Sequence, residues 1–289
     1  MNRTIRQVLT PLDSPGNEQV KRKRMVLEPG NWMATDPFLF LAEDWFQKPG
    51  GFPDHPHRGI ETVTLVLDGE LLHADNRGNS GVLRTNDVQW MTAGGGIIHA
   101  GLPYEESLVH SLQLWVNMPS TQKMVPSTYQ DLHVADSLVA EDGSGSIRVI
   151  SGDVEGASAP VHNAVPVLYL DTTVEAAGRM LLPVPASFNG FVYVLDGAAK
   201  FGADQVDGNA GQVLWLDYPQ GGSGVSSLEV QAEPSTRFLL IAGEPIQQPV
   251  VAYGPFVMNT KDEIVQAFED YRDGKFGGPT PAGLEMGRN

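Results

Sequence analysis

A His-x-His pair with a third histidine far along the chain is the feature that most constrains the fold. His55 and His57 are two residues apart. In an extended segment such residues point to the same side, so both rings can enter one cavity. His99 follows 42 residues after His57, behind a strand-turn-strand passage and the Gly-rich run at 94–96. Because imidazole is a common metal ligand, this pattern predicts a metal pocket on a β scaffold.

Glu61 is the first carboxylate after this pair along the chain. It lies four residues after His57, about 13 Å away if the strand runs straight. A reversal at Arg58 and Gly59 would bring it closer, because glycine permits the backbone of a tight turn. The other four histidines stand in no such pattern, and we expect surface or hydrogen-bonded core roles for His73, His110, His133 and His162.

Short apolar runs between turn residues predict an all-β protein. The 289 residues include 32 Gly and 21 Pro, which favour many turns. Residues 62–67 are apolar and mostly β-branched, and Asp-Gly at 68–69 suits a hairpin turn. Further strands are expected at 25–27, 38–42, 70–75 and 111–118, with a strand pair within 82–91.

The second half of the chain repeats the pattern of the first. Val-Tyr-Val-Leu-Asp-Gly at 192–197 echoes Thr-Leu-Val-Leu-Asp-Gly at 64–69, at an offset of 128 residues. A polar, Gly/Ser-rich break at 140–146 separates the two halves. Repetition at this scale predicts two tandem barrels, 1–138 with the metal site and 139–289 without one. The residues that replace the four candidate ligands in the second half are Pro183, Pro185, Asn189 and Gly224.

A short helix is predicted near the C-terminus. Thr260 and Glu263 have the spacing of a capping box, in which each side chain satisfies a free backbone N–H. Apolar residues recur at helical spacing after it, and Gly274 is a suitable stop. The helix is expected to pack on a barrel, with partner binding as the alternative. Residues 277–281 are expected to be mobile, with nothing to pack against.

Charge and cysteine content exclude several classes of function. The chain has no cysteine, so it has no disulfide, thiolate ligand or thiolate nucleophile. The 35 acidic and 19 basic residues give a net charge of −16, which disfavours direct binding of nucleic acid. The basic run at 21–24 is interpreted as a solvated strand edge, with a nuclear-import or docking patch as the alternative.

The N-terminus lacks the apolar core of a signal peptide, and no apolar run approaches the roughly 20 residues that cross a bilayer. A soluble protein without membrane contact is therefore expected. The cytoplasm is its expected location, or the nucleus as well if the source is eukaryotic.

Four strings of this sequence resemble the pirin family of the cupin superfamily. Residues 55–64 (HPHRGIETVT) and 87–94 (DVQWMTAG) are similar to its two cupin motifs, and 113–117 (QLWVN) and 254–260 (GPFVMNT) match as well. The resemblance covers nearly the whole chain. It implies a bicupin, with two β-barrels and one metal, usually iron, in the first barrel. Some relatives oxidise the flavonol quercetin with dioxygen, and others are described as metal-dependent regulators that bind protein partners.

The sequence departs from this family at the metal. In pirin-like sequences a ligating glutamate usually stands two residues after the third histidine, and here that residue is Gly101. Glu61, the acidic position of the general cupin motif, and water are the candidates to complete the shell. Glu105 and Glu106 are expected to be a solvated pair. The ligands that carry over from the resemblance are His55, His57 and His99.

Imidazole and carboxylate donors suit Fe, Mn, Ni, Cu or Zn, and the resemblance favours iron. Arg58, beside the ligands, either holds an anionic group or pins the turn. With Gly101 in place of a base, we expect a metal-dependent regulatory protein that binds a protein partner. The alternative is a quercetin 2,3-dioxygenase-like enzyme acting on a small flavonol-type aromatic, and no catalytic residue is assigned for it. A second alternative is a vestigial site that binds no metal.

Overall fold

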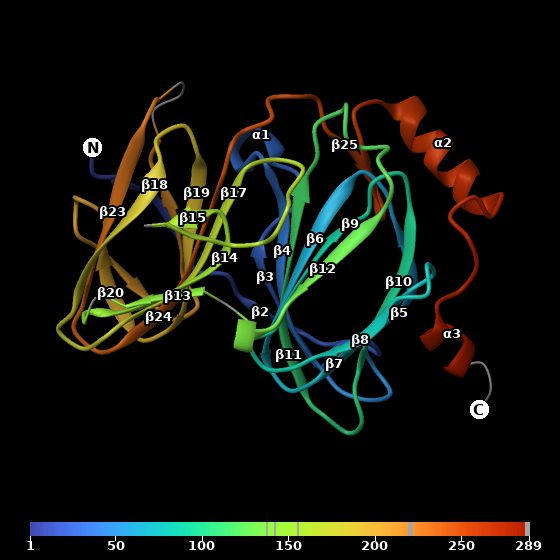
Figure 1. The fold of residues 1–289 in the computed structure, drawn as a ribbon, viewed down its shortest axis with the longest axis horizontal. Helices are drawn as coiled ribbons and strands as arrows, with labels where there is room; N and C mark the ends of the chain where they lie inside the picture. The colour runs from blue at the N-terminus through green and yellow to red at the C-terminus, as the bar shows by residue number, and fades with distance from the viewer. Residues whose placement is uncertain (137, 142, 155, 219–221, 287–289) are drawn as a thin grey trace. The chain divides into compact units, whose positions relative to one another are not determined.

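Short antiparallel strands make up most of the chain, as the apolar runs predict (Figure 1). The structure is a computed structural model that describes residues 1–136, 138–141, 143–154, 156–218 and 222–286. It forms two compact units. Unit 1 comprises Met1–Leu12, Thr35–Pro37 and Ala135–Pro245, and unit 2 comprises Asp13–Ala34, Phe38–Val134 and Ile246–Asn289.

These units differ from a contiguous division into 1–138 and 139–289. The first twelve residues belong to unit 1 because β1 (Ile5–Leu9) pairs with β22 (Val213–Leu216). At the other end, the segment from residue 246 onward belongs to unit 2. Neither terminal segment could be assigned to its unit from local sequence, since each assignment depends on contacts between residues about 200 positions apart.

The Gly/Ser-rich break at 140–146 lies inside unit 1. It joins β13 (Leu138–Glu141) to β14 (Gly145–Ser151), which pair as an antiparallel hairpin. Residue 142 within it lies outside the described residues. The polar residues therefore mark a hairpin turn, and the chain passes between the units a few residues earlier, at 134–135.

Unit 2 contains a seven-stranded and a four-stranded antiparallel sheet. The strand orders are β12-β9-β6-β11-β4-β3-β2 and β5-β10-β7-β8. Apolar side chains of both sheets meet in a shared core, for example Phe46 and Val66 with Leu71 and Leu83. The strands are β2 (Asp13–Pro15), β3 (Arg22–Leu27), β4 (Phe38–Phe46), β5 (Phe52–His57), β6 (Ile60–Asp68), β7 (Leu71–Asp75), β8 (Ser80–Leu83), β9 (Val88–Thr92), β10 (Ile97–Pro103), β11 (Val109–Asn117), β12 (Thr128–Leu132), and the separate pair β25 (Val251–Tyr253) and β26 (Phe256–Met258).

Unit 1 repeats this topology. Its sheets have the orders β1-β22-β19-β24-β17-β14-β13 and β18-β23-β20-β21. The two strands that carry the repeated sequence, β6 and β19, hold equivalent central places, so the predicted duplication of an all-β barrel is confirmed. The remaining strands are β15 (Asp153–Val154), β16 (Ala157–Ser158), β17 (Val167–Val174), β18 (Arg179–Pro185), β19 (Asn189–Asp196), β20 (Ala198–Phe201), β21 (Val206–Asn209), β23 (Val225–Ala232) and β24 (Thr236–Gly243).

The predicted C-terminal helix is α2 (Lys261–Arg272), and both hydrogen bonds of its capping box are present. The tail beyond it is ordered, contrary to expectation. Phe276 is buried against Phe256, and the backbone N–H of Thr280 donates to Asp54 on β5 at 3.0 Å. The short helix α3 (Pro281–Met286) follows and contacts β5 and β7 (Figure 1). This tail therefore covers the strand that carries two of the candidate ligands.

The other helical segments are α1 (Trp32–Thr35) and the 3₁₀ turn η1 (Val134–Asp136). In the described ranges, no helix has the length and apolar character needed to cross a membrane.

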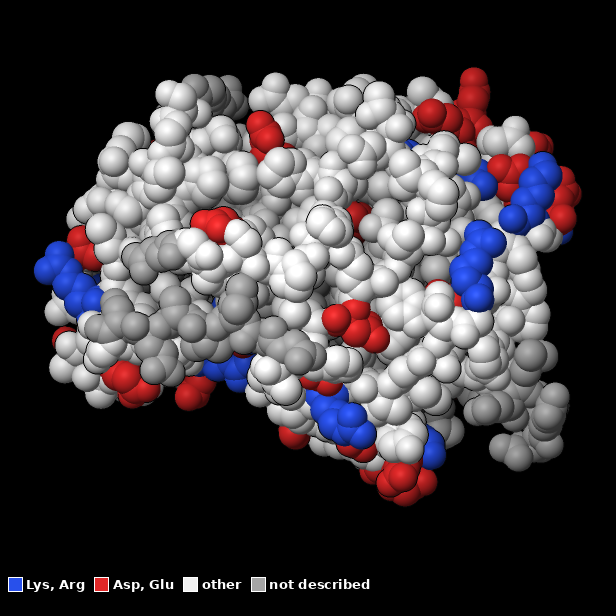
Figure 2. Space-filling view, in the orientation of Figure 1, with Lys and Arg blue, Asp and Glu red and all other residues white. Residues whose placement is uncertain are grey.

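The basic run at 21–24 lies mainly in β3, which is not an edge strand. Arg24 forms ion pairs with Asp13 on the true edge strand β2 at 2.7 Å and with Glu43 on β4 at 3.1 Å. The interpretation of this run as a sheet edge was therefore wrong, because its guanidinium groups join neighbouring strands. Figure 2 shows basic side chains scattered among acidic ones on the visible face, without a continuous basic surface.

Candidate metal centre

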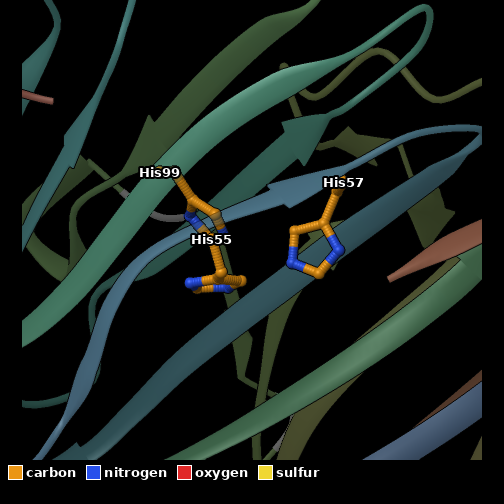
Figure 3. Close-up of side chains that lie close together, drawn as sticks. All are labelled: His55, His57 and His99. Atoms are coloured by element: carbon orange, nitrogen blue, oxygen red, sulfur yellow. The ribbon is translucent and has the colours of Figure 1, made fainter. Parts of the chain in front are cut away.

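Three histidines of unit 2 converge on one point. His55 and His57 lie on β5, and His99 lies on the neighbouring strand β10, directly opposite His55 in the antiparallel register. Figure 3 shows the three rings turned toward one another. One nitrogen from each ring lies within 4.8 Å of the other two, which is close enough for all three to bind a single ion. The His-x-His spacing thus places both β5 rings on the same side of the strand.

The environment of these rings suits a metal ion. The Nδ1 atoms of His55 and His57 lie 2.8 Å from the carbonyl oxygen of Pro53 and 3.4 Å from that of Pro255, which orients the rings and leaves Nε2 available. The Nε2 atoms of His57 and His99 are buried and have no hydrogen-bond partner in the described part of the chain. Because an unpaired buried polar atom costs about 1–3 kcal/mol, these atoms fit a metal ligand role.

The rings are also in the protonation state that a metal requires. Burial lowers the pKa of His55 and lowers the pKa of His57 and of His99 well below the ordinary histidine value. All three imidazoles are therefore neutral at pH 7, and no proton has to be displaced for a metal to bind.

Glu61 does not belong to this cluster of donors. It is fully buried on β6, where its Oε1 accepts a hydrogen bond of 2.8 Å from the hydroxyl of Thr92. Thr64, three residues further along β6, lines the cavity beside His99. Since successive side chains of a strand alternate between its two faces, Glu61 points to the opposite face of this sheet. The reversal at residues 58–59 exists, but it presents the carboxylate away from the histidines.

The turn after β5 is tied to the C-terminal segment. Gly59 has a φ of +79°, and a Cβ there would lie 2.0 Å from the carbonyl oxygen of Val257, so only glycine fits. The buried Arg58 donates from Nε to Gly95 O at 2.8 Å and from its terminal nitrogen to Asp270 on α2 at 2.8 Å. Two roles were expected for Arg58, binding an anionic group or holding the turn in place, and these contacts favour the second.

Gly101 leaves an open place beside the histidines. It lies on β10, and a Cβ built there would meet only Leu71 Cδ1, at 3.8 Å. Its backbone lies outside the left-handed region that favours glycine, so a larger side chain would be tolerated. Glu105 and Glu106, the next acidic residues, are exposed as expected. The carboxylate that the family resemblance implies is absent, although the backbone would permit one.

A cavity of about 20 Å³ adjoins the cluster, bounded by His55 and His99. Its wall also includes Asp44 and His73, both buried. Neither residue is predicted to line the site from its sequence context. His73 follows the apolar pair Leu-Leu in an ordinary strand pattern, and only the pairing of β7 with β10 shows that it enters the site.

The corresponding part of unit 1 has an apolar interior. There the inward-facing residues of β18 include Leu182 and Val184, which pack against Leu228 on β23. They lie one position from Pro183 and Pro185, so the offset of 128 residues misplaces the register by one residue. Leucine and valine cannot ligate a metal. Across the described ranges of the chain, the one group of converging donors found is that of unit 2.

Comparison with known proteins identifies the family. The family described as Pirin matches residues 19–116, and the Pirin C-terminal cupin domain matches residues 169–277. A pirin-like protein from Solanum lycopersicum is 41% identical over 274 residues, covering 94% of this chain and 92% of its own.

Two solved structures are similar over nearly their whole length. GK1651 from Geobacillus kaustophilus is 45% identical, with a TM-score of 0.83 over 86% of this chain and 99% of its own. A quercetin 2,3-dioxygenase from Acinetobacter baumannii is 32% identical, with a TM-score of 0.85 over 96% of this chain and 99% of its own. With its duplicated barrel and its three-histidine cluster in one unit, the present chain belongs to the pirin family of bicupin proteins.

Proposed function

We propose that this chain is a metal-dependent regulatory protein, in which one divalent ion bound by His55, His57 and His99 sets the conformation of a protein-binding surface. Iron is the expected ion. Three neutral imidazoles also accept Mn, Ni, Cu or Zn, because affinity alone does not select among them. When bound, the ion would act as a Lewis acid beside the cavity that His55 and His99 line.

The observation that carries this proposal is the direct bonding of the ligand strand to the C-terminal segment. His57 is oriented by the carbonyl of Pro255, and the carbonyl of Arg58 accepts a hydrogen bond of 3.1 Å from the N–H of Val257. The buried Nζ of Lys123 donates to the carbonyls of Gly59 at 2.8 Å and Val257 at 3.0 Å. A shift of the His57 ring on metal binding would therefore be transmitted to β26 through these hydrogen bonds.

The same connection continues into α2. Arg58 is paired with Asp270 on α2, and its guanidinium lies 4.6 Å from the ring centre of Phe276 in the tail. Apolar surface of α2 stays exposed: Val265 is 56% exposed, and Phe268, whose ring packs on Phe256, is 37% exposed. Exposed apolar surface of this kind suits contact with another protein. We assign the partner-binding role to this surface, whose position the metal would control.

A flavonol dioxygenase is the second candidate, favoured by the similarity to a protein named quercetin 2,3-dioxygenase. Two features count against it. Gly101 provides no base to remove the flavonol proton, and a cavity of about 20 Å³ has room for roughly one water molecule. Turnover of a flavonol would require both a different base and a larger cavity.

Hydrogen–deuterium exchange of iron-loaded and chelated protein tests the regulatory proposal. Loading should slow exchange in β26 and α2 as well as in β5 and β10. His57→Ala should abolish this response, whereas His110→Ala, which changes a histidine bonded to Glu43 outside the cavity, should preserve it. Protection confined to β5 and β10 would show that the metal does not act on the C-terminal segment. Quercetin-dependent dioxygen uptake by the same samples tests the enzyme alternative.

A further inference from the structure

We propose that residues 276–283, here called the C-terminal strap, position the metal ligands from the outer face of their sheet, through a contact between Asp54 and Thr280. This inference rests on the metal centre proposed above. It assigns a function to a segment whose composition predicts only mobility.

The strap contacts the side of β5 and β10 that faces away from the three histidines. Asp54 precedes His55 on β5, and Ala100 follows His99 on β10. Since successive side chains of a strand alternate between its faces, Asp54 and Ala100 point away from the ligands. Ala282 of the strap packs against Ala100 in one buried cluster. The strap therefore touches the immediate neighbours of two ligands without entering the cavity.

The carboxylate of Asp54 holds the strap through two hydrogen bonds. Its Oδ2 accepts from the backbone N–H of Thr280 at 3.0 Å, and its Oδ1 accepts from the hydroxyl of the same residue. Thr280 is fully buried, and its hydroxyl oxygen accepts in turn from the N–H of Gly283 at 2.9 Å. Because hydrogen bonds to an ionised group are roughly twice as strong as those between neutral groups, this contact is the main attachment of the strap to β5.

The other end of the strap is attached to β10. Phe276 is buried against Ile98, the residue before His99. Asn76, directly after β7, donates from its side-chain amide to the carbonyl of Phe276. The amide oxygen of Asn76 accepts a hydrogen bond of 3.1 Å from the N–H of Ile98. One asparagine thereby bonds both the strap and the strand that carries His99.

The spacing of β5 and β10 determines whether the ligands can share one ion. His55 and His99 are directly opposed, so the distance between their rings depends on how firmly these strands are held together. β5 is the edge strand of its sheet, and its register with β10 shifts between His99 and Gly101. The strap supports this irregular edge from outside. Since a metal leaves when its ligands separate, the strap should slow metal release although it does not touch the metal.

Release of cobalt(II) from loaded protein into excess chelator, followed by visible absorption, tests this role. Thr280→Val removes the hydroxyl at nearly constant size and should speed release about tenfold, the effect of losing one hydrogen bond to a charged group. Thr280→Ser keeps the hydroxyl and should stay within about twofold of wild type. Asp54→Asn should also speed release. Combining it with Thr280→Val should add little, since both substitutions weaken the same contact.

The matched control is Thr260→Val. The hydroxyl of Thr260 also caps a C-terminal helix, but its described hydrogen bonds join it only to Glu263, within the cap of α2. Its substitution should therefore leave cobalt release unchanged. A purely structural role of Thr280 would lower the unfolding temperature of metal-free protein without changing cobalt release, and that result would overturn the inference. If Thr280→Val does not fold, Asp54→Asn decides.

Hydrogen–deuterium exchange gives a second readout. If the strap holds the ligand strands, bound cobalt also holds the strap, because coupling between two sites is reciprocal. Cobalt should slow exchange in the peptide that contains Thr280 and Gly283 in wild type, and should have no effect there in His55→Ala. Unchanged exchange in loaded wild type would contradict the inference. Wild-type protein that takes up no cobalt would instead refute the metal centre itself, and with it the role of the strap.

Discussion

Nδ1 of His57 lies 3.4 Å from the carbonyl oxygen of Pro255, a residue 198 positions further along the chain. A candidate ligand is thereby connected to the segment that leads into α2. In second-shell contacts of this kind, the partner of the ring fixes its orientation for the metal. Here the partner belongs to the C-terminal segment, so the orientation of the ring depends on that segment.

The first prediction concerns the contribution of the metal to folding. His57→Ala should abolish metal binding and leave a folded protein, because the barrel cores of unit 2 exist independently of the site. Thermal unfolding should reveal the lost metal linkage, about 2.7 kcal/mol at a free metal concentration one hundred times Kd. Without metal, the variant and the wild type should unfold at similar temperatures. An insoluble or unfolded variant would mean that the metal is structural.

The second prediction separates Glu61 from the ligands. Glu61→Gln should leave metal stoichiometry and affinity unchanged, since the carboxylate points to the other face of β6 and is bonded to Thr92. His99→Gln is the matched comparison and should lose the metal. A fall in metal affinity of Glu61→Gln comparable to that of His99→Gln would place Glu61 in the shell after all.

The third prediction restores the missing carboxylate. Gly101→Glu should raise iron affinity by about tenfold, because it adds a charged ligand to three neutral ones at a position with room for a side chain. If flavonol binding also opens the cavity, quercetin-dependent dioxygen uptake should rise with it. Gly101→Gln has nearly the same size without the charge and serves as the control. Robust turnover by the unmodified protein would contradict the view that Gly101 disables this chemistry.

The fourth prediction concerns pH. Burial raises the pKa of Asp44 from 3.8 to about 6, so the folded protein holds this proton more tightly than the unfolded chain does. The stability from this group is full below pH 3.8 and is lost as the pH rises through about 6. Urea unfolding of metal-free protein should show wild type losing about 1 kcal/mol more than Asp44→Asn between pH 5 and pH 7. Equal slopes would show that Asp44 titrates normally.

The sequence predicts the parts of this molecule that depend on local patterns. Short apolar runs specify strands such as β6 and β11, and the capping box locates the start of α2. The His-x-His pair places two rings on one face, and the family resemblance adds His99. Each of these features is carried by residues that are close along the chain or by a specific motif.

Features that depend on register and on distant pairing could not be predicted in this way. The side to which Glu61 points depends on where the turn at Gly59 ends, and a change of one residue would reverse it. His73 enters the site only because β7 pairs with β10 at Gly101. The packing of the tail on β5 joins Asp54 to Thr280, and no local signal in a Gly/Pro-rich tail predicts that contact.

Metal analysis of the purified, iron-loaded protein tests the central claim most directly. Wild type should contain one tightly bound ion per chain, and the His55, His57 and His99 variants to alanine should each contain almost none after the same treatment. Glu61→Gln and His73→Leu should contain as much as wild type. No bound metal in wild type would show that the site is vestigial. Two tight ions per chain, or full occupancy in the histidine variants, would place the metal elsewhere and contradict the account.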